Sequence, residues 1–511
     1  MERHWLAEAP YSSEKLATLL GEHYRADWTP ATETHVDVLD TFGWAVWHSG
    51  KLLCRTSAKQ LRLYNHQGAL EADAEAPRSA RLWWQLPEGE LRQALKPIVD
   101  LWSFNPVASF TQRSHSVDIC NEDGKTVARL QHTTSSTGQQ AHCSLMALRG
   151  YEQSFERIVT KLTAEYTASA PPLAEKAWLQ ACAAPRKLDK LPHFGIQAQQ
   201  NAESAVRQMI RAMLDQARIF EAGILADTDT EFLHQYRVSI RKARSLVTLM
   251  GGVLSKDVKS ALKQGFKQVV GPTGELRDMD VFLLARDDYS ALLPSGFEQG
   301  LEELFNQASK DRRRALAKVR RWMKSASYQQ VIKELEDTLD GPAQLQTKKA
   351  NKPVAALLEK NAWKSFRRIQ TLGLAVDKHT PDEEVHALRI ECKKMRYLME
   401  YFIEILPKKP TMKFVKSLKK LQDVLGDFND YAVQQNFLRQ YTDSHTSSAA
   451  LNAATGGMIA VLHQLHRQAR QEVEAAFAGF NSAEVESTFS AIFTGEILVS
   501  GKTKDSGETQ G

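Results

Sequence analysis

His234-Gln-Tyr-Arg237-Val-Ser-Ile-Arg241-Lys242-Ala-Arg244 is repeated 152 residues later as His386-Ala-Leu-Arg389-Ile-Glu-Cys-Lys393-Lys394-Met-Arg396, and every cation of the first copy falls on a cation of the second. On an α-helix each residue turns by about 100°, so positions i, i+3, i+7 and i+10 lie within an arc of roughly 80°. The first copy therefore forms one stripe, about 15 Å long, from His234, Arg237, Arg241 and Arg244. The second copy forms the matching stripe.

Each stripe borders an apolar helix face, which in the first copy contains Tyr236, Ile240 and Val247. Four like charges on one helix face repel, by a few tenths of a kcal/mol per neighbouring pair. Neither stripe has Asp or Glu at any of its four positions. A solvated basic face would explain a single stripe, whereas two stripes in register, each beginning with histidine, favour a binding surface for a polyanion.

The candidate anion-binding residues combine both stretches with cations on other helices. Guanidinium presents a planar fork to two oxygens, and ammonium is a compact point charge, so both suit phosphate. The candidates are His234, Arg237, Arg241, Lys242, Arg244, Arg314, Lys318, His386, Arg389, Lys393, Lys394, Arg396, Lys419 and Arg470. Imidazole is a cation only when protonated, which predicts tighter binding at pH 6 than at pH 8; packing or capping is the alternative role for the two histidines. Binding should weaken steeply with salt.

Residues 197–480 are predicted to be helical almost throughout, from their apolar periodicity. The fixed offset indicates an internal repeat, with copies at 197–340 and 353–480 and a linker at 341–352. We predict two four-helix bundles related by a pseudo-twofold axis, which can bring both stripes to a shared groove. Glycine-containing turns are predicted at 274–280 and, in the second copy, at 426–432. The predicted helices span residues 202–223, 257–270, 295–337 and 451–477.

Residues 1–166 are predicted to be rich in β-strands. Residues 35–40 alternate in polarity, and residues 116–120 and 126–130 flank an Asn-Glu-Asp-Gly turn, the pattern of a hairpin. A linker is predicted at 167–196, where prolines recur, and a C-terminal extension at 481–511 ends in a polar, disordered tail. The fold class is therefore α+β.

Composition is that of an ordinary soluble protein, with 42% hydrophobic and 25% charged residues. Residues 1–200 hold 21 lysines and arginines against 22 aspartates and glutamates, and the remainder holds 45 against 39, so the positive excess lies with the stripes. The five cysteines are scattered without CxxC spacing, which suits a reducing cytoplasm. We expect no signal peptide and no membrane helix, because no apolar run approaches about 20 residues.

The paired HxxRxxxR/K-K-x-R stretches, the GxxRD and GxxND sequences and the duplicated helical body resemble the CHAD domain, the conserved histidine α-helical domain, over residues 197–480. The resemblance implies binding of inorganic polyphosphate along a basic groove, without catalysis, in the cytoplasm and at polyphosphate granules. It also carries an older suggestion of metal chelation by histidines. Each stripe offers one histidine with no second ligand at i+4, so we predict neither a metal nor a cofactor.

The N-terminal part is similar to the CYTH domain of the triphosphate tunnel family. The likeness rests on Val38-Leu-Asp-Thr41, Gly50-Lys-Leu-Leu-Cys-Arg55, Leu86-Pro-Glu-Gly-Glu-Leu-Arg92 and Asn121-Glu-Asp-Gly-Lys-Thr-Val-Ala-Arg-Leu130. It implies an antiparallel β-barrel. The family's ExExK metal-binding motif is missing, since Glu2 is followed by His4, and Mg²⁺ prefers several oxygen ligands. A degenerate barrel is therefore predicted, and a metal-dependent inorganic triphosphatase is the alternative.

Two questions remain open in the sequence. Asp278, Asp280 and Asp430 either pair with stripe arginines or only terminate helices at glycine-containing turns. Nucleic acid would need aromatic stacking platforms among the cations, and only Tyr397 lies near a stripe, so nucleic acid is not the predicted partner. The sequence does not determine the oligomeric state.

Overall fold

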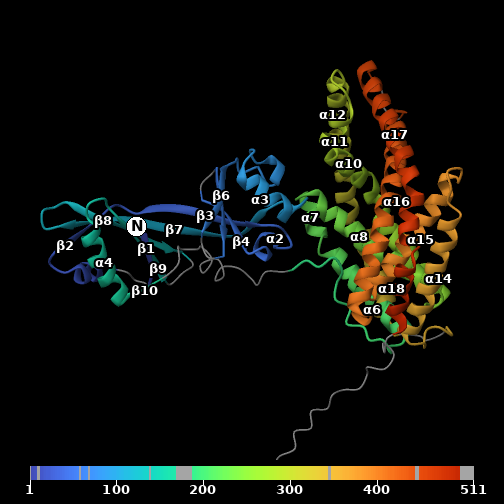
Figure 1. Ribbon diagram of the computed structural model, residues 1–511, viewed down its shortest axis with the longest axis horizontal. Helices are drawn as coiled ribbons and strands as arrows, with labels where there is room; N and C mark the ends of the chain where they lie inside the picture. The colour runs from blue at the N-terminus through green and yellow to red at the C-terminus, as the bar shows by residue number, and fades with distance from the viewer. Residues whose placement is uncertain are drawn as a thin grey trace, which may run out of the picture. The chain divides into compact units, whose positions relative to one another are not determined.

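The chain folds as two units, Met1–Lys190 and Leu191–Gly511. The computed structural model describes residues 2–8, 12–56, 59–66, 69–136, 140–168, 187–342, 347–443 and 448–494 (Figure 1). An antiparallel sheet forms most of the first unit and helices form the second, so the predicted α+β class is confirmed. The tail after Val499 and most of the predicted linker at 167–196 lie outside the described residues.

The described strands of the first unit pair in the order β10-β1-β9-β8-β7-β3-β4-β5-β6, and β2 also pairs with β7. Every pairing is antiparallel, and the predicted hairpin is present as β7 and β8. The elements are β1 (Glu2–Glu8), α1 (Ser13–Leu20), β2 (Tyr24–Trp28), β3 (Thr32–Asp40), α2 (Ala45–His48), β4 (Lys51–Arg55), β5 (Gln60–Asn65), β6 (Leu70–Glu75), η1 (Trp83–Gln85), α3 (Glu90–Val99), β7 (Asn105–Asn121), β8 (Thr126–Ser135), β9 (Gln140–Ala147), α4 (Glu152–Glu165) and β10 (Thr167–Ala168).

The predicted barrel is wrong, because the described sheet does not close. Strand β6 pairs only with β5 and β10 only with β1 among the described strands, whereas a barrel needs its first and last strands to pair. The long strand β7 explains the difference. Its first part pairs with β3 and its last part with β8, so the sheet divides into two staggered halves. The resemblance to a CYTH domain stays a prediction.

Each half of the sheet buries its own apolar face under helices. In one half, α1 and α4 cover a core that includes Trp5, Leu130 and Phe155. In the other, α2 and α3 cover a core that includes Leu53 and Leu91. Because helices cover these apolar faces, the sheet does not have to close into a barrel to bury them.

The second unit consists of helices, and none of its described helices is long and apolar enough to cross a membrane. They are α6 (Ala202–Arg218), α7 (Glu221–Ala226), α8 (Thr230–Leu249), α9 (Lys256–Val270), η2 (Gly271–Thr273), α10 (Gly274–Leu284), α11 (Arg286–Leu292), α12 (Glu298–Met323), α13 (Ala326–Asp340), α14 (Val354–Leu374), α15 (Asp382–Tyr401), η3 (Ile403–Ile405), α16 (Lys408–Asp443), α17 (Ala449–Phe480) and α18 (Ala483–Thr494).

Two four-helix arrangements are present, as the repeat predicts. Helices α6, α8, α9 and α13 pack as one, and α14, α15, α16 and α18 as the other. The rings of Phe366 and Phe489, stacked with centroids 4.4 Å apart, join α14 to α18. Helices α6, α8 and α9 begin 152 residues before α14, α15 and α16 respectively. Helix α18 lies in the segment predicted as an extension.

Four predicted elements differ from the structure. The helix predicted at 202–223 is two helices, α6 and α7. The helix predicted at 295–337 is also two, because Ser325 caps α13 by accepting a hydrogen bond from the Tyr328 amide at 3.2 Å. The turns predicted at 274–280 and 426–432 are both wrong, since α10 begins at Gly274 and α16 runs through Gly426. Pro272 lacks an N–H and interrupts the first copy ahead of α10; Val424 stands at that position in the second copy.

Helices of both copies share a further core, at the end of the unit where α10, α11 and α12 project beside α16 and α17 (Figure 1). Phe282 and Phe305 from the first copy pack there with Leu438 and Leu451 from the second. The two copies therefore cannot be separated without opening this core.

The close approach of α12 to α17 predicts opposite effects for two glycine substitutions. A Cβ atom at Gly300 would overlap the carbonyl of Ala450, so Gly300→Ala should destabilise the unit by about 1–3 kcal/mol. A Cβ atom at Gly456, inside α17, meets nothing within 4 Å, so Gly456→Ala should stabilise it by up to about 1 kcal/mol. Thermal unfolding followed by circular dichroism would measure both. Shifts of the midpoint in the same direction would contradict the packing.

Candidate anion-binding groove

The two cationic stripes meet because α8 and α15 pack against each other. The Tyr401 hydroxyl donates a hydrogen bond to the Lys242 carbonyl at 3.4 Å across this contact. Arg241 and Arg244 of α8 face Lys393 and Lys394 of α15 across a cavity of about 640 Å³, here called the central compartment. Helix α9 completes its wall. The remaining lining residues are Ser245, Thr248, Leu249, Ser260, Lys263, Gln264, Lys267, Ile390 and Tyr397.

Among the residues that the structure describes, no carboxylate lines the central compartment. Arg241, Arg244 and Lys393 form no salt bridge within the part of the chain that the structure describes. Burial, together with the charges of Arg389 and Arg241, lowers the pKa of Lys393 to about 8. The compartment therefore holds positive charge that the described residues do not neutralise.

A second compartment, of about 580 Å³, adjoins the first at Arg241 and lies between α8, α10, α11 and α16. It is here called the aromatic compartment. Its cationic wall is formed by Arg237, Arg241 and Arg277, and His234 lies among them. The other lining residues are Val238, Asp278, Val281, Phe282, Tyr289, Asp430, Val433, Gln434, Asn436, Phe437 and Gln440.

Its histidine is neutral near neutral pH in the unliganded protein. Burial, and then the charges of Arg277, Arg241 and Arg237, lower the pKa of His234 to about 4. A change of binding between pH 6 and pH 8 therefore cannot come from His234 losing its own proton in the free protein. His386 is exposed and lines neither compartment, so the predicted pH effect of the histidines stays a prediction.

A third compartment, of about 570 Å³, shares Thr248, Leu249 and Lys394 with the central one and lies beside α14. It is here called the α14 compartment. Its one carboxylate, Glu391, is engaged by the Lys394 ammonium at 2.9 Å and the Ser365 hydroxyl at 2.7 Å. The cations lining it are Lys349, Lys364, Arg367, Arg368 and Lys394. The three compartments form one groove that follows α8 and α15.

The structure brings six of the candidate residues to this groove. They are His234, Arg237, Arg241, Arg244, Lys393 and Lys394. Arg389 lies next to it, with its guanidinium 3.4 Å from the Asp430 carboxylate. Arg396 lies over the Tyr397 ring, 5.6 Å from its centroid, and reaches Glu400 at 3.5 Å. Lys242 is half-buried and lines none of the three compartments.

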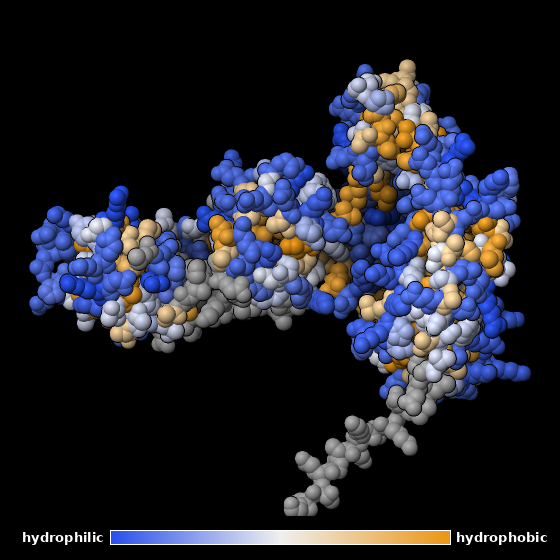
Figure 2. Space-filling model, in the orientation of Figure 1, coloured by the Kyte–Doolittle hydropathy of each residue, from blue (hydrophilic) through white to orange (hydrophobic). Residues whose placement is uncertain are grey.

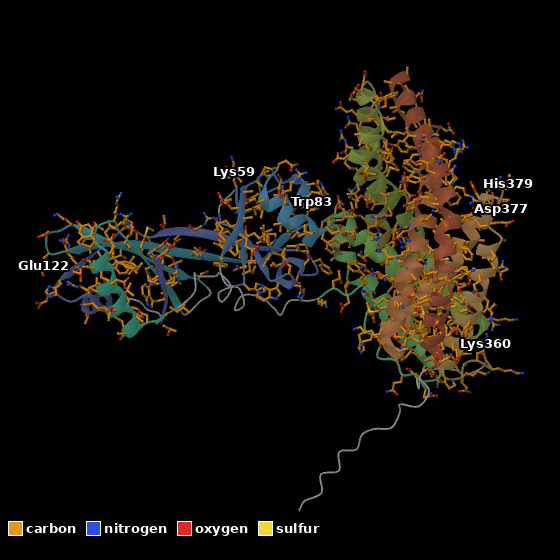
Figure 3. All side chains as sticks on the ribbon, in the orientation of Figure 1. Lys59, Trp83, Glu122, Lys360, Asp377 and His379 are labelled. Carbon is orange, nitrogen blue, oxygen red and sulfur yellow. The ribbon has the colours of Figure 1, made fainter. Side chains whose placement is uncertain are left out.

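Four other candidates also do not line the three compartments. Arg314 pairs with Asp311 at 2.9 Å, and Lys318 with Glu275 at 2.9 Å. Lys419 is exposed on α16. Arg470 donates to the carbonyls of Asp377 and Thr380 in the loop that joins α14 to α15. Figure 3 shows Asp377 beside His379 in that loop.

The three aspartates have different roles. Asp430 pairs with the stripe residue Arg389, as one of the two alternatives expected. Asp280 is buried and pairs with Arg312 at 2.7 Å, away from the stripes. Asp278 pairs with no arginine within the described residues, but Arg237 and Arg277 lower its pKa against the larger effect of burial, which raises it.

Cations on α9, α10 and α14 complete the groove and were absent from the candidates. Lys256, Lys263 and Lys267 recur at helical spacing on α9, as do Lys360, Lys364 and Arg367 on α14. This periodicity is a usable signal, because residues seven and eleven apart share a helix face. The sequence of one helix does not reveal which face meets another helix.

Within the described residues, no group of three or more His, Cys, Asp or Glu side chains could hold a metal ion. Most of the charged groups that line the groove are instead cations, which suit an anion. In the part of the chain that the structure describes, the Nη1 atom of Arg277, a residue that lines the aromatic compartment, is buried without a hydrogen-bond partner. Buried donors of this kind are rare unless a ligand or water satisfies them.

The model of the CHAD domain family matches residues 208–439. The uncharacterized protein Rv2226 of Mycobacterium tuberculosis is 22% identical over 293 residues, which cover 54% of this chain and 53% of that protein. The chain thus spans about half the length of this relative. The CHAD domain from the plant Ricinus communis is 21% identical with a TM-score of 0.46, covering 58% of this chain and 96% of that one. PptA from Streptomyces chartreusis is 17% identical with a TM-score of 0.35, covering 56% and 100%.

The charges around the central compartment predict a lowered pKa for Lys393. Its ammonium should titrate near pH 8, because burial and neighbouring cations disfavour the charged form. Arg241→Gln removes one of these charges and should raise the pKa. Arg470→Gln, on α17, removes a charge that does not line the compartment and should leave it unchanged. Carbon-13 NMR of dimethylated lysines would follow the titration. If both substitutions changed the pKa of Lys393 equally, the charge of Arg241 would not be the cause of the lowered pKa.

Proposed function

We propose, because residues 208–439 of this chain form a CHAD domain, that the chain binds inorganic polyphosphate along the groove between α8 and α15. One observation carries the proposal. Cations from both copies of the repeat, Arg241 and Arg244 in one and Lys393 and Lys394 in the other, line a single compartment, and its described lining residues include no carboxylate. The family is associated with polyphosphate binding.

The form of the groove supports a chain in preference to a single phosphate. Three compartments of about 580, 640 and 570 Å³ adjoin one another through shared residues. Cations occur in each of them, so successive phosphates of an extended chain would each meet a counter-charge. A flexible polyanion would release its own counterions on binding, which makes affinity strongly dependent on salt.

The central compartment offers little to a nucleobase. Its one aromatic residue, Tyr397, is 9% exposed and stacks on Tyr401 with ring centroids 5.4 Å apart. Base stacking needs an accessible ring face. A phosphate chain needs none, so the compartment favours polyphosphate over single-stranded nucleic acid. We also propose that binding takes place in the cytoplasm, at polyphosphate granules, and without turnover of the chain.

Removing charge from the central compartment tests the proposal. The triple variant Arg241→Gln, Arg244→Gln, Lys393→Gln should bind polyphosphate at least about 100-fold more weakly, since each lost contact to phosphate is worth about 1 kcal/mol or more. The slope of log affinity against log salt should fall by about 2, at about 0.7 per lost contact. Calorimetric titration of the full chain measures both quantities.

A matched triple variant serves as the control. Arg314→Gln, Lys318→Gln, Lys419→Gln removes the same charge from candidate residues that do not line the compartments. Its affinity should stay within about threefold of the parent, because none of the three side chains lines a compartment and Arg314 and Lys318 are already engaged by carboxylates. Equal losses in the two variants would show that net charge, and not the groove, binds the chain.

Lys393 predicts how affinity depends on pH. Phosphate stabilises the ammonium, so the pKa of Lys393 is higher in the complex than its value of about 8 in the free protein. Affinity should therefore be full below pH 8 and fall by about tenfold as the pH rises to 9.5. Lys393→Arg keeps its charge over this range and should flatten the profile. Titrations between pH 7 and 9.5 would refute this role for Lys393 if both proteins lost affinity in parallel.

A further inference from the structure

The aromatic compartment contains groups that a bare phosphate chain cannot use. Phosphate oxygens only accept hydrogen bonds, and so do the ionised carboxylates of Asp278 and Asp430. Hydroxyl groups, by contrast, donate to carboxylates, in the way that an acidic side chain recognises a ribose. The presence of both aspartates beside His234 and three arginines points to a ligand that carries hydroxyls as well as phosphate.

One wall of this compartment is apolar and partly accessible. The rings of Phe282 and Phe437 lie with centroids 5.2 Å apart, and Phe437 is half-buried. The side chains of Val281 and Val433, from α10 and α16, are 44% and 57% exposed. Figure 2 shows hydrophobic and hydrophilic residues meeting in the hollow of the second unit, below the projecting end. A flat, uncharged ring would cover this wall and remove it from water.

Amide side chains edge the same wall. Gln434, Asn436 and Gln440 of α16 line the compartment. Gln434 and Gln440 have no hydrogen-bond partner within the residues that the structure describes. A carboxamide presents both a donor and an acceptor, as the edge of a nucleobase does. A volume of about 580 Å³ lies within the range of roughly 300–1,000 Å³ that small-molecule sites occupy.

The arginines fix the direction in which such a ligand would lie. Arg241 belongs to both the aromatic and the central compartments, so phosphates attached to a ligand in the first can pass into the second. Arg277 lines the same compartment, as does Arg237. Along α16 the amides and the apolar wall at Gln440, Phe437 and Val433 lead to Asp430, which pairs with Arg389. This order matches base, ribose and phosphates.

We propose that the aromatic compartment binds the nucleoside of a nucleoside oligophosphate, whose phosphates extend past Arg241 into the central compartment. The base lies against Phe437, Val281 and Val433, and the ribose hydroxyls donate to Asp278 and Asp430. This inference rests on the proposed function, because the phosphates occupy the same cations as polyphosphate. It adds a ligand that competes with polyphosphate at one end of the groove.

Calorimetric titration of the full chain without divalent metal tests the proposal with ATP, 2′,3′-dideoxy-ATP, tripolyphosphate and long-chain polyphosphate. Tripolyphosphate carries more negative charge than ATP, so electrostatics alone would make it bind more tightly. We expect ATP to bind at least about tenfold more tightly than tripolyphosphate, because the base gains stacking contacts. The dideoxy compound, which lacks the two hydroxyls, should bind several-fold more weakly than ATP.

Two tryptophan substitutions on α16 provide matched variants. Val433→Trp fills the wall and should reduce ATP affinity to that of tripolyphosphate, while tripolyphosphate affinity changes by less than about twofold. Met412→Trp is the control, because Met412 is also 57% exposed and lines none of the three compartments. Neither side chain is buried in a core, so both variants should fold.

The outcomes separate this inference from the proposed function. If long-chain polyphosphate binds and ATP binds no more tightly than tripolyphosphate, or if the dideoxy compound and Val433→Trp have no effect, the nucleoside site is refuted and the proposed function stands. If neither polyphosphate nor ATP binds, the proposed function fails and the inference fails with it. Equal effects of Val433→Trp and Met412→Trp would also refute the site.

Discussion

Repulsion between the cations of α8 and α15 is the constraint that the helical unit has to overcome. Each helix is held by its own apolar face, with Tyr236 and Ile240 buried in one bundle and Cys392 and Met395 in the other. Burial of one such side chain stabilises the fold by about 1.5–3 kcal/mol, whereas each neighbouring pair of like charges costs a few tenths. Packing therefore outweighs repulsion, and neither helix can rotate its stripe away. The positive field is a consequence of the cores, and an anion can bind to it without rearranging the helices.

The duplication supplies the second half of each compartment. One copy alone would present the stripe of α8 to solvent, where charges are screened and hydrated. Contact with α15 places a second stripe opposite, and the pKa of Lys393 is lowered by its burial and by the charges of Arg389 and Arg241. The shared core around Phe282, Phe305 and Leu438 then holds α10 and α16 together at the far end. The aromatic compartment, like the central one, is built from both copies.

Local patterns predicted the helices, the repeat and the two stripes, because apolar periodicity and a fixed offset depend on neighbours in the sequence. Partners far apart in the chain were not predictable in the same way. Lys318 satisfies the pattern of an anion-binding residue, but its ammonium is engaged by Glu275, which precedes it by 43 residues. The lysines of α9 follow a pattern that can be recognised in the sequence as easily as that of Lys318. It is the packing of α9 against α8 that places Lys263 and Lys267 in the groove. In the first unit the β7–β8 hairpin was predictable, whereas barrel closure depended on pairing between distant strands and was wrong.

Burial and positive charge act differently on the three kinds of cation in the groove. Both effects disfavour protonation, so a group keeps its charge only if its ordinary pKa is far above neutral. The ordinary pKa of arginine is far above neutral, so Arg237 remains a cation although burial lowers its pKa. The ordinary pKa of lysine is lower, and burial with the neighbouring charges brings the pKa of Lys393 to about 8. The ordinary pKa of histidine is already close to neutral, so the same effects leave His234 uncharged. The residue that begins the stripe therefore contributes little charge until an anion has bound, and the arginines must make the first contact.

A neutral imidazole among guanidinium groups can still donate one hydrogen bond and accept another, which suits a ligand with both phosphate and hydroxyl groups.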